Sequence, residues 1–215
     1  MFRRKLENGK IAGVFIRHPT AGKVILVNYN DDVYRQRFTV AHEAAHCILD
    51  DEEDIIVSFT KYDKKDLAEI RANAFASHYL LPPKLIRSIP DPTRWDRETA
   101  ISWANRLMVN VSTLAYALKG ARLIDDMTVS MLEKVAIPRD IKRDAELPDS
   151  LSLLQRQRLE FVLELGLSHS YVRRCLSAYR RGLISLARMA EMLLLDETEM
   201  PEILGLFGED LSCDG

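Results

Sequence analysis

The spacing of apolar residues changes along the first 80 positions from that of strands to that of helices. Two runs of mainly β-branched residues, 11–16 and 24–27, flank the turn-forming stretch HPTAG, which predicts a β-hairpin. The later run IIVSF predicts a short strand. Between hairpin and strand, Phe38, Ala41 and Ala45 recur at helical spacing and predict a helix over residues 35–49.

The rest of the chain has a helical pattern. A helix over residues 66–81 should end where Pro82 and Pro83 follow it. Beyond it the pattern predicts an α+β fold, in which a small sheet with its helices is followed by an all-α region. The further helices are expected as a pair within 97–124, then at 151–165, at 170–181 before Gly182, after the cap Ser185, and at 199–207. The predicted domains are residues 1–90, 91–127 and 128–215.

Composition excludes several classes of protein. The chain has 215 residues and a formal net charge of -2, so no global positive field attracts nucleic acid or an anionic membrane. No apolar run approaches the roughly 18 residues of a membrane span, and no secretory signal is recognised at the start. Three widely spaced cysteines, Cys47, Cys175 and Cys213, predict a reducing, cytoplasmic setting. The cluster Arg3-Arg4-Lys5 is expected to be a solvated end.

The helix over residues 35–49 carries candidate chemistry in the sequence HEAAH. His42 and His46, four residues apart, share one face and can offer two imidazole nitrogens to one Zn²⁺ ion. Glu43 lies about 100° around the helix, where it can act as a general base without binding the metal. Ordinary amphipathic helices also spell this short pattern by chance. A third ligand is therefore needed.

The next helix offers that ligand in Glu69, with Asn73 four residues later on the same face. The carboxylate can bind the metal, and Asn73 can accept the remaining N–H of a ligating histidine. The alternative is that Glu69 is a surface carboxylate paired with Arg71 or Lys65. His78 is nine residues past Glu69, on roughly the opposite side of the helix, and is not expected to be a ligand.

Several neighbouring residues have expected structural roles. Ile70, Phe75 and Leu81, with Ala74, should pack the helix over residues 66–81, and Cys47 is expected to be a core thiol. The residue that stabilises an oxyanion is left open among three candidates, Tyr62, Tyr79 and Arg71.

The two motifs together resemble a known family. RFTVAHEAAHCIL followed by EIRANAFASHYLLPP is similar to the ImmA/IrrE zinc-dependent metallopeptidases over about residues 10–125. The later stretch WANRLMVNVSTLAYALKGARLI resembles the helix-turn-helix-like segment of that family. The resemblance implies a zincin-like core with zinc on His42, His46 and Glu69 and with Glu43 as the base. It also implies cleavage of a helix-turn-helix (Xre-type) repressor, which relieves repression of a mobile-element, stress or DNA-damage response.

A second hypothesis is a DNA-binding regulator with a structural or vestigial metal site. Helix-turn-helix-like spacing occurs over residues 104–118 and 190–203. The first candidate reading helix carries only Lys119, and the second is rich in Asp and Glu, which repel phosphate. Direct nucleic-acid binding is therefore disfavoured. A basic patch, which could bind nucleic acid or an acidic partner, is formed by Arg173, Arg174, Arg180 and Arg181.

A third hypothesis makes residues 150–210 an interaction module. Leu186, Met189, Leu193 and Leu194 form an apolar stripe that is expected to close the local core. The alternatives are a homodimer through these helices or docking of the repressor. A thiol block of the metal by Cys213, which would keep a peptidase latent, is a further hypothesis.

Overall fold

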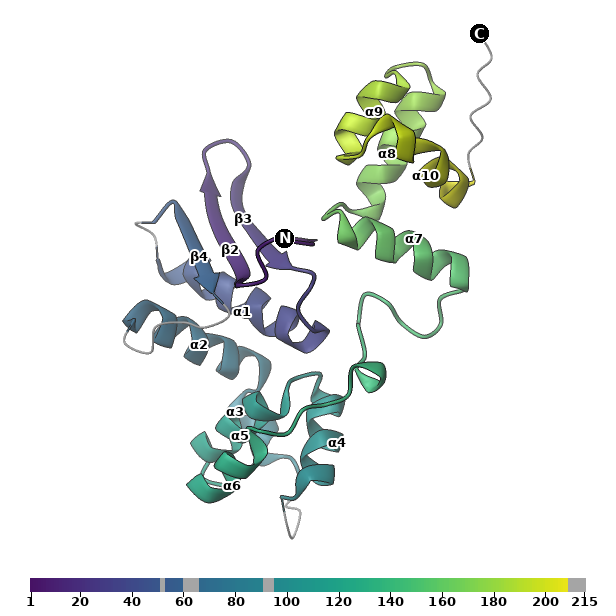
Figure 1. Cartoon of the computed structure of the whole chain (residues 1–215). Coiled ribbons are helices and arrows are strands. Elements are labelled where there is room, and N and C mark those ends of the chain that lie inside the picture. Colours follow the sequence, from purple (N-terminus) through teal and green to yellow (C-terminus); the bar gives the residue numbers. More distant parts are fainter. Residues whose placement is uncertain (51–52, 60–65, 91–94, 209–215) are drawn as a thin grey trace. The chain divides into compact units, whose positions relative to one another are not determined.

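The structure, a computed structural model, describes residues 1–50, 53–59, 66–90 and 95–208. Contacts divide the chain into two compact units, one formed by Met1 with Leu6–Asp144 and the other by Phe2–Lys5 with Ala145–Gly215 (Figure 1). The predicted α+β fold is confirmed, while the predicted boundaries at residues 90 and 127 remain predictions. No helix of the described ranges is long and apolar enough to cross a bilayer.

A small antiparallel sheet opens the first unit. Strands β2 (Ile11–His18) and β3 (Gly22–Asn28) form the predicted hairpin, and the predicted strand β4 (Ile55–Phe59) pairs with the other edge of β2. The core residue Phe15 stands opposite Ile25 on one side and Ile56 on the other. Register shifts between Ile11 and Gly13, which marks a bulge at the end of β2 nearest the candidate site.

Helix α1 (Val33–Leu49) lies across this sheet, and α2 (Leu67–Leu80) lies beside α1 (Figure 1). Asp32 caps α1 by accepting the backbone N–H groups of Tyr34 and Arg35, and Asp66 caps α2 in the same way. Ala41 and Ala45 are buried on α1, and their small side chains allow the helix to approach its neighbours closely. Both predicted helices are confirmed.

The buried row of α2 differs from the prediction. Ala72, Ala76 and Leu80, spaced four residues apart, form the buried face of the helix. Ile70 and Ala74 lie about 160° around the helix from Ala72 and are exposed, so the prediction that they pack the helix is wrong. Leu81, just beyond the helix, is buried as expected, and Phe75 stacks on Tyr79. The apolar residues of α2 therefore lie on two faces of the helix, one buried in the core and one exposed.

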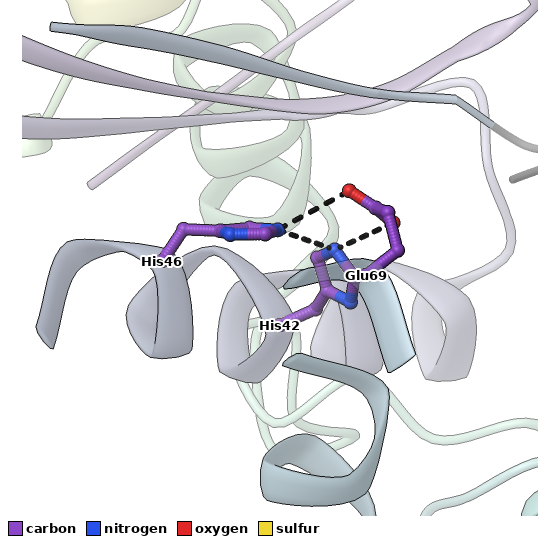
Figure 2. Close-up of side chains that lie close together, drawn as sticks. All are labelled: His42, His46 and Glu69. Carbon is purple, nitrogen blue, oxygen red and sulfur yellow. Dashed lines mark hydrogen bonds and ion pairs between the residues drawn. The ribbon is translucent and has the colours of Figure 1, made fainter. Parts of the chain in front are cut away.

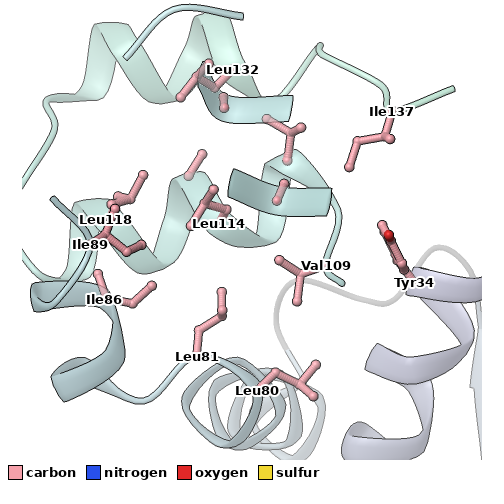
Figure 3. Close-up of a cluster of buried hydrophobic side chains, with 14 of the residues drawn as sticks. Tyr34, Leu80, Leu81, Ile86, Ile89, Val109, Leu114, Leu118, Leu132 and Ile137 are labelled. Atoms are coloured by element: carbon pink, nitrogen blue, oxygen red, sulfur yellow. The ribbon is translucent and has the colours of Figure 1, made fainter. Parts of the chain in front are cut away.

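Helices after α2 complete the first unit around one apolar core (Figure 3). The predicted pair is present as α4 (Arg97–Leu107) and α5 (Val111–Gly120), and Met108 adopts a left-handed conformation between them. Leu114 and Leu118 of α5 are fully buried in this core. Three short elements were not predicted: α3 (Pro83–Arg87), α6 (Asp126–Leu132) and the 3-10 turn η1 (Arg139–Ile141).

The second unit is a bundle of short helices with its own core. Met189 and Leu193 are buried and Leu186 packs against them, as predicted, but Leu194 is 51% exposed and ends its helix in a left-handed conformation. Arg3, expected to be solvated, is buried and pairs with Glu146 at 3.6 Å. The elements are β1 (Phe2–Arg4), α7 (Leu153–Glu164), α8 (His169–Arg180), α9 (Leu186–Leu193), the 3-10 turn η2 (Glu197–Glu199) and α10 (Met200–Phe207).

Left-handed residues set the turns of this bundle. Gly166, Gly182 and Leu194 each follow a helix, have positive φ and precede a leucine. Gly182 donates to the Tyr179 carbonyl and Leu183 to the Ala178 carbonyl, the hydrogen-bond pattern of a Schellman motif. The predicted role of Gly182 as a helix terminator is therefore confirmed. Cys213 lies outside the described residues, so the hypothesis of a thiol block stays untested.

Candidate metal centre

Three side chains from α1 and α2 converge on one point (Figure 2). His42 Nε2 and His46 Nε2 are 3.0 Å apart, and each lies 3.3 Å from an oxygen of Glu69. One donor atom from each residue lies within 4.8 Å of the others, which is compact enough to surround a single metal ion. His42 and His46 are buried, and the side chain of Glu69 is 13% exposed.

The outer nitrogens of both histidines face hydrogen-bond acceptors. His42 Nδ1 lies 3.1 Å from Asn73 Oδ1, and His46 Nδ1 lies 2.7 Å from Asp50 Oδ2. Because these oxygens can only accept, each Nδ1 carries the hydrogen of the neutral imidazole and each Nε2 keeps its lone pair. Two lone pairs 3.0 Å apart, facing a carboxylate, repel one another unless a cation lies between them. The donor set thus fits a metal ion.

The neighbours of Glu69 favour its ionised form, which can bind a cation. Contacts with His42 and His46 lower the pKa of Glu69 to about 2, so it is ionised throughout the physiological range. Burial works to lower the pKa of His46, but its hydrogen bonds with Glu69 and Asp50 outweigh burial and raise that pKa. The site as a whole therefore attracts positive charge, either a proton or a metal ion.

Glu43 lies against strand β2 and is close enough to His42, His46 and Glu69 to interact with them electrostatically. The residue is 0% exposed, and neither carboxylate oxygen has a hydrogen-bond partner within the described ranges. Burial raises the pKa of Glu43, while the Ser58 hydroxyl and then the neighbouring His42 and His46 act in the opposite direction. A Cβ added to Gly13 of β2 would lie 2.6 Å from Glu43 Oε1, so only glycine leaves room for this carboxylate. A buried carboxylate beside metal donors is typical of a functional group.

Asp50 and Arg71 complete the surroundings of His46, and sequence reasoning missed Asp50. Asp50 is the C-cap of α1, where the chain leaves the helix with φ -112° and ψ 72° and brings the carboxylate to His46. Arg71 of α2 pairs with the other oxygen of Asp50. The alternative in which Glu69 is a surface carboxylate paired with Arg71 is therefore contradicted, and Lys65 lies outside the described residues.

A hollow of about 680 Å³ adjoins the converging donors. Its lining includes His42, Glu69 and Asn73, and also His78, although His78 was expected on the opposite side of α2. Tyr79, a candidate for oxyanion stabilisation, is 70% exposed and does not line this hollow. Tyr62 lies outside the described residues. A second hollow of about 510 Å³ adjoins His46 and Glu69 and includes Asp50, Glu53 and Asp66 in its lining.

The arrangement defines a class of protein. Two histidines four residues apart on one helix, with a glutamate beside the first and a carboxylate from the next helix, form the site of a metallopeptidase. The comparison with protein families agrees: residues 1–119 match the Peptidase M78 model, described as the IrrE N-terminal-like domain. The chain belongs to this family, which confirms the predicted resemblance. A search of curated proteins found no match.

Proposed function

We propose that the protein is a zinc-dependent regulatory endopeptidase that cleaves a helix-turn-helix (Xre-type) repressor in the cytoplasm. One observation carries the catalytic part: two bare Nε2 atoms and an ionised carboxylate meet at one point, while both Nδ1 atoms are engaged elsewhere. Neutral imidazoles and a carboxylate are ligands that suit zinc, and a catalytic zinc site uses three protein ligands.

His42, His46 and Glu69 would hold the ion. A bound zinc ion supplies Lewis-acid chemistry: it polarises a carbonyl and makes water more acidic. Asn73 and Asp50 orient the two imidazoles through their Nδ1 hydrogens, so the donor atoms need no rearrangement. This preorganisation is what the hydrogen bonds of α1 and α2 contribute to the reaction.

Glu43 moves the proton. Its carboxylate accepts a proton from water as the water attacks the scissile carbonyl, and it then delivers this proton to the leaving amine. Burial raises the pKa of Glu43 in spite of the nearby Ser58 hydroxyl, which suits a group that must both accept and donate a proton. Gly13 gives this carboxylate the room it occupies.

The regulatory part of the proposal rests on membership of the IrrE-like family and on the resemblance of the two motifs. The repressor, the zinc ion and the response that is relieved belong to the proposal. The test incubates the zinc-loaded protein with a helix-turn-helix repressor encoded beside it. We expect chelator-sensitive cleavage by the wild type and a loss of about 10²–10⁴-fold in Glu43→Gln, which keeps the shape of the side chain. Intact repressor with every zinc-loaded sample would overturn the proposal.

The competing function is a DNA-binding regulator with a structural metal. Structural zinc sites are closed by four protein ligands, whereas three donors converge here and the described surroundings leave a hollow of about 680 Å³ beside His42 and Glu69. An open site next to a cleft is the arrangement that catalysis requires. Binding of operator DNA by the purified chain, without any cleavage of the repressor, would favour the regulator instead.

A further inference from the structure

We propose, on the basis of the peptidase function above, that the hollow beside His42 and Glu69 is a substrate groove that selects an uncharged, apolar side chain next to the scissile bond. The structure assigns α5 as one wall of this groove. We call it the α5 groove; besides the two ligands, the residues that carry the argument are Phe38, Phe59, Ile70, Ala74, Tyr116 and His78.

Large apolar side chains that should be buried are exposed in the α5 groove. Ile70 of α2, Phe59 of β4 and Tyr116 of α5 are 43%, 51% and 55% exposed, and all three line the hollow that contains His42 and Glu69. Exposed apolar residues gathered in one concave place indicate a binding site, because leaving them in water costs free energy. A role in binding substrate would therefore explain why Ile70 is exposed instead of packed in the core.

The charged side chains described in the lining of the α5 groove already face partners of opposite or complementary character. Besides the histidines, the part of its lining that the structure describes carries two charged side chains, Glu69 and Arg35. Glu69 faces the two imidazoles, and Arg35 pairs with Asp31 at 3.4 Å. A charged substrate side chain would lose its hydration without gaining a counter-charge, so an apolar side chain binds better.

The α5 groove is long enough for a peptide segment. Its α2 wall runs along the helix from Glu69 through Ile70, Asn73 and Ala74 to His78, and these residues span about half of the helix circumference. Nine residues of helix span roughly 14 Å, which equals about four residues of extended chain. A polypeptide can therefore lie along α2 with its scissile bond at the metal ligands.

Helix α5, which the DNA-binding hypothesis makes the first candidate reading helix, forms the opposite wall. Ser112, Thr113 and Tyr116 line the α5 groove, while Leu114 and Leu118 anchor the helix in the core. The Tyr116 hydroxyl donates to Glu133 Oε2 at 2.9 Å, which holds its ring in place. The face of α5 that would have to reach DNA thus lines the peptidase cleft, and we assign it to substrate selection.

The test measures binding rather than cleavage. Zinc-loaded Glu43→Gln is titrated with two fluorescent pools of randomised decapeptides, one with leucine and one with aspartate fixed at a central position. We expect the leucine pool to bind at least about tenfold more tightly, a difference of about 1.4 kcal/mol. Ile70→Lys should remove this preference, and Tyr79→Lys, a matched charge on the same helix outside the groove, should keep it. Ala74→Phe narrows the groove and should weaken the leucine pool more than a pool with fixed alanine.

The outcomes separate the two proposals. Equal binding of the leucine and aspartate pools, no binding of either pool, or an unchanged preference in Ile70→Lys and Ala74→Phe overturns the α5 groove. If the preference is found but the wild type cleaves no repressor, the groove stands and the peptidase proposal fails. If cleavage is chelator-sensitive but the preference is absent, the peptidase proposal stands and the α5 groove fails.

Discussion

His46 Nδ1 lies 2.7 Å from Asp50 Oδ2, and the other oxygen of Asp50 pairs with Arg71. One largely buried carboxylate thus connects α1, which carries both histidines, with α2, which carries Glu69. The connection fixes the ring of His46 and the distance between the two helices at the same time.

Asp50→Asn should weaken zinc binding by about 10–100-fold, the usual effect of losing a partner of a ligating histidine. Asparagine can still accept the Nδ1 hydrogen, but it removes the negative charge that makes His46 a better donor. A competition titration with a chromophoric chelator measures the change. Asp54→Asn, an exposed neighbour that does not line the second hollow, is the matched control. Wild-type affinity in Asp50→Asn would show that Asp50 has no role in metal binding.

Gly13→Ala should destabilise the protein by about 1–3 kcal/mol, because overpacking forces neighbouring groups to move. The added methyl would lie 2.6 Å from both Glu43 Oε1 and Thr39 Cγ2. Thermal unfolding measures the loss, and peptidase activity should fall further than the folded fraction because Glu43 is displaced. Gly9→Ala is the control, since within the described residues no atom beyond its chain neighbours lies within 4 Å of its added methyl. Equal melting temperatures for both variants would contradict the close approach of β2 to Glu43.

Much of the local structure follows from the sequence. The hairpin of β2 and β3 and the helices α1 and α2 were predicted because apolar period, turn residues and caps agree within each segment. The candidate site could be predicted in part from the sequence. His42 and His46 follow from their spacing on one helix, while Glu69 and Asn73 required a specific second motif.

The parts that escaped prediction depend on contacts distant in sequence. Asp50 reaches His46 only because the chain leaves α1 with particular backbone angles, which no spacing rule contains. Ile70 has the apolar side chain of a core residue. Whether it is buried depends on which face of α2 meets α1 and α5, and the sequence does not show this. Arg3 is buried and pairs with Glu146, which is more than 140 residues away in the sequence.

Lys142→Met should destabilise the protein at neutral pH by up to about 3 kcal/mol, the lower end of the range for breaking a buried ion pair, because Asp32 keeps some exposure to water. Lys142 Nζ donates to Asp32 Oδ1 at 2.6 Å and to Asn110 Oδ1 at 2.8 Å, and its side chain is buried. Since Asp32 caps α1, the pair supports the helix that carries the metal ligands. Denaturant titration checks the value, with the exposed Lys134→Met as control.

The same pair predicts a dependence on pH. Burial acts to raise the pKa of Asp32, but the hydrogen bond and charge of Lys142 outweigh it and keep the pKa below its ordinary value. A carboxyl with a depressed folded pKa stabilises the protein above its unfolded pKa, near 3.9, and this contribution is lost as pH falls through the folded value. The stability difference between wild type and Lys142→Met should therefore shrink below about pH 4. A constant difference down to pH 2 would exclude Asp32 as its source.

The central claim is that His42, His46 and Glu69 together hold one zinc ion. Elemental analysis of metal-replete, dialysed protein tests it most directly, with His46→Ala and Glu69→Ala beside wild type and with His78→Ala as a control for loss of a histidine that lies outside the donor set. We predict one zinc per chain in the wild type, Glu43→Gln and His78→Ala, and much less in the two ligand variants. A wild type without metal, or a Glu69→Ala that retains a full equivalent, would contradict the account.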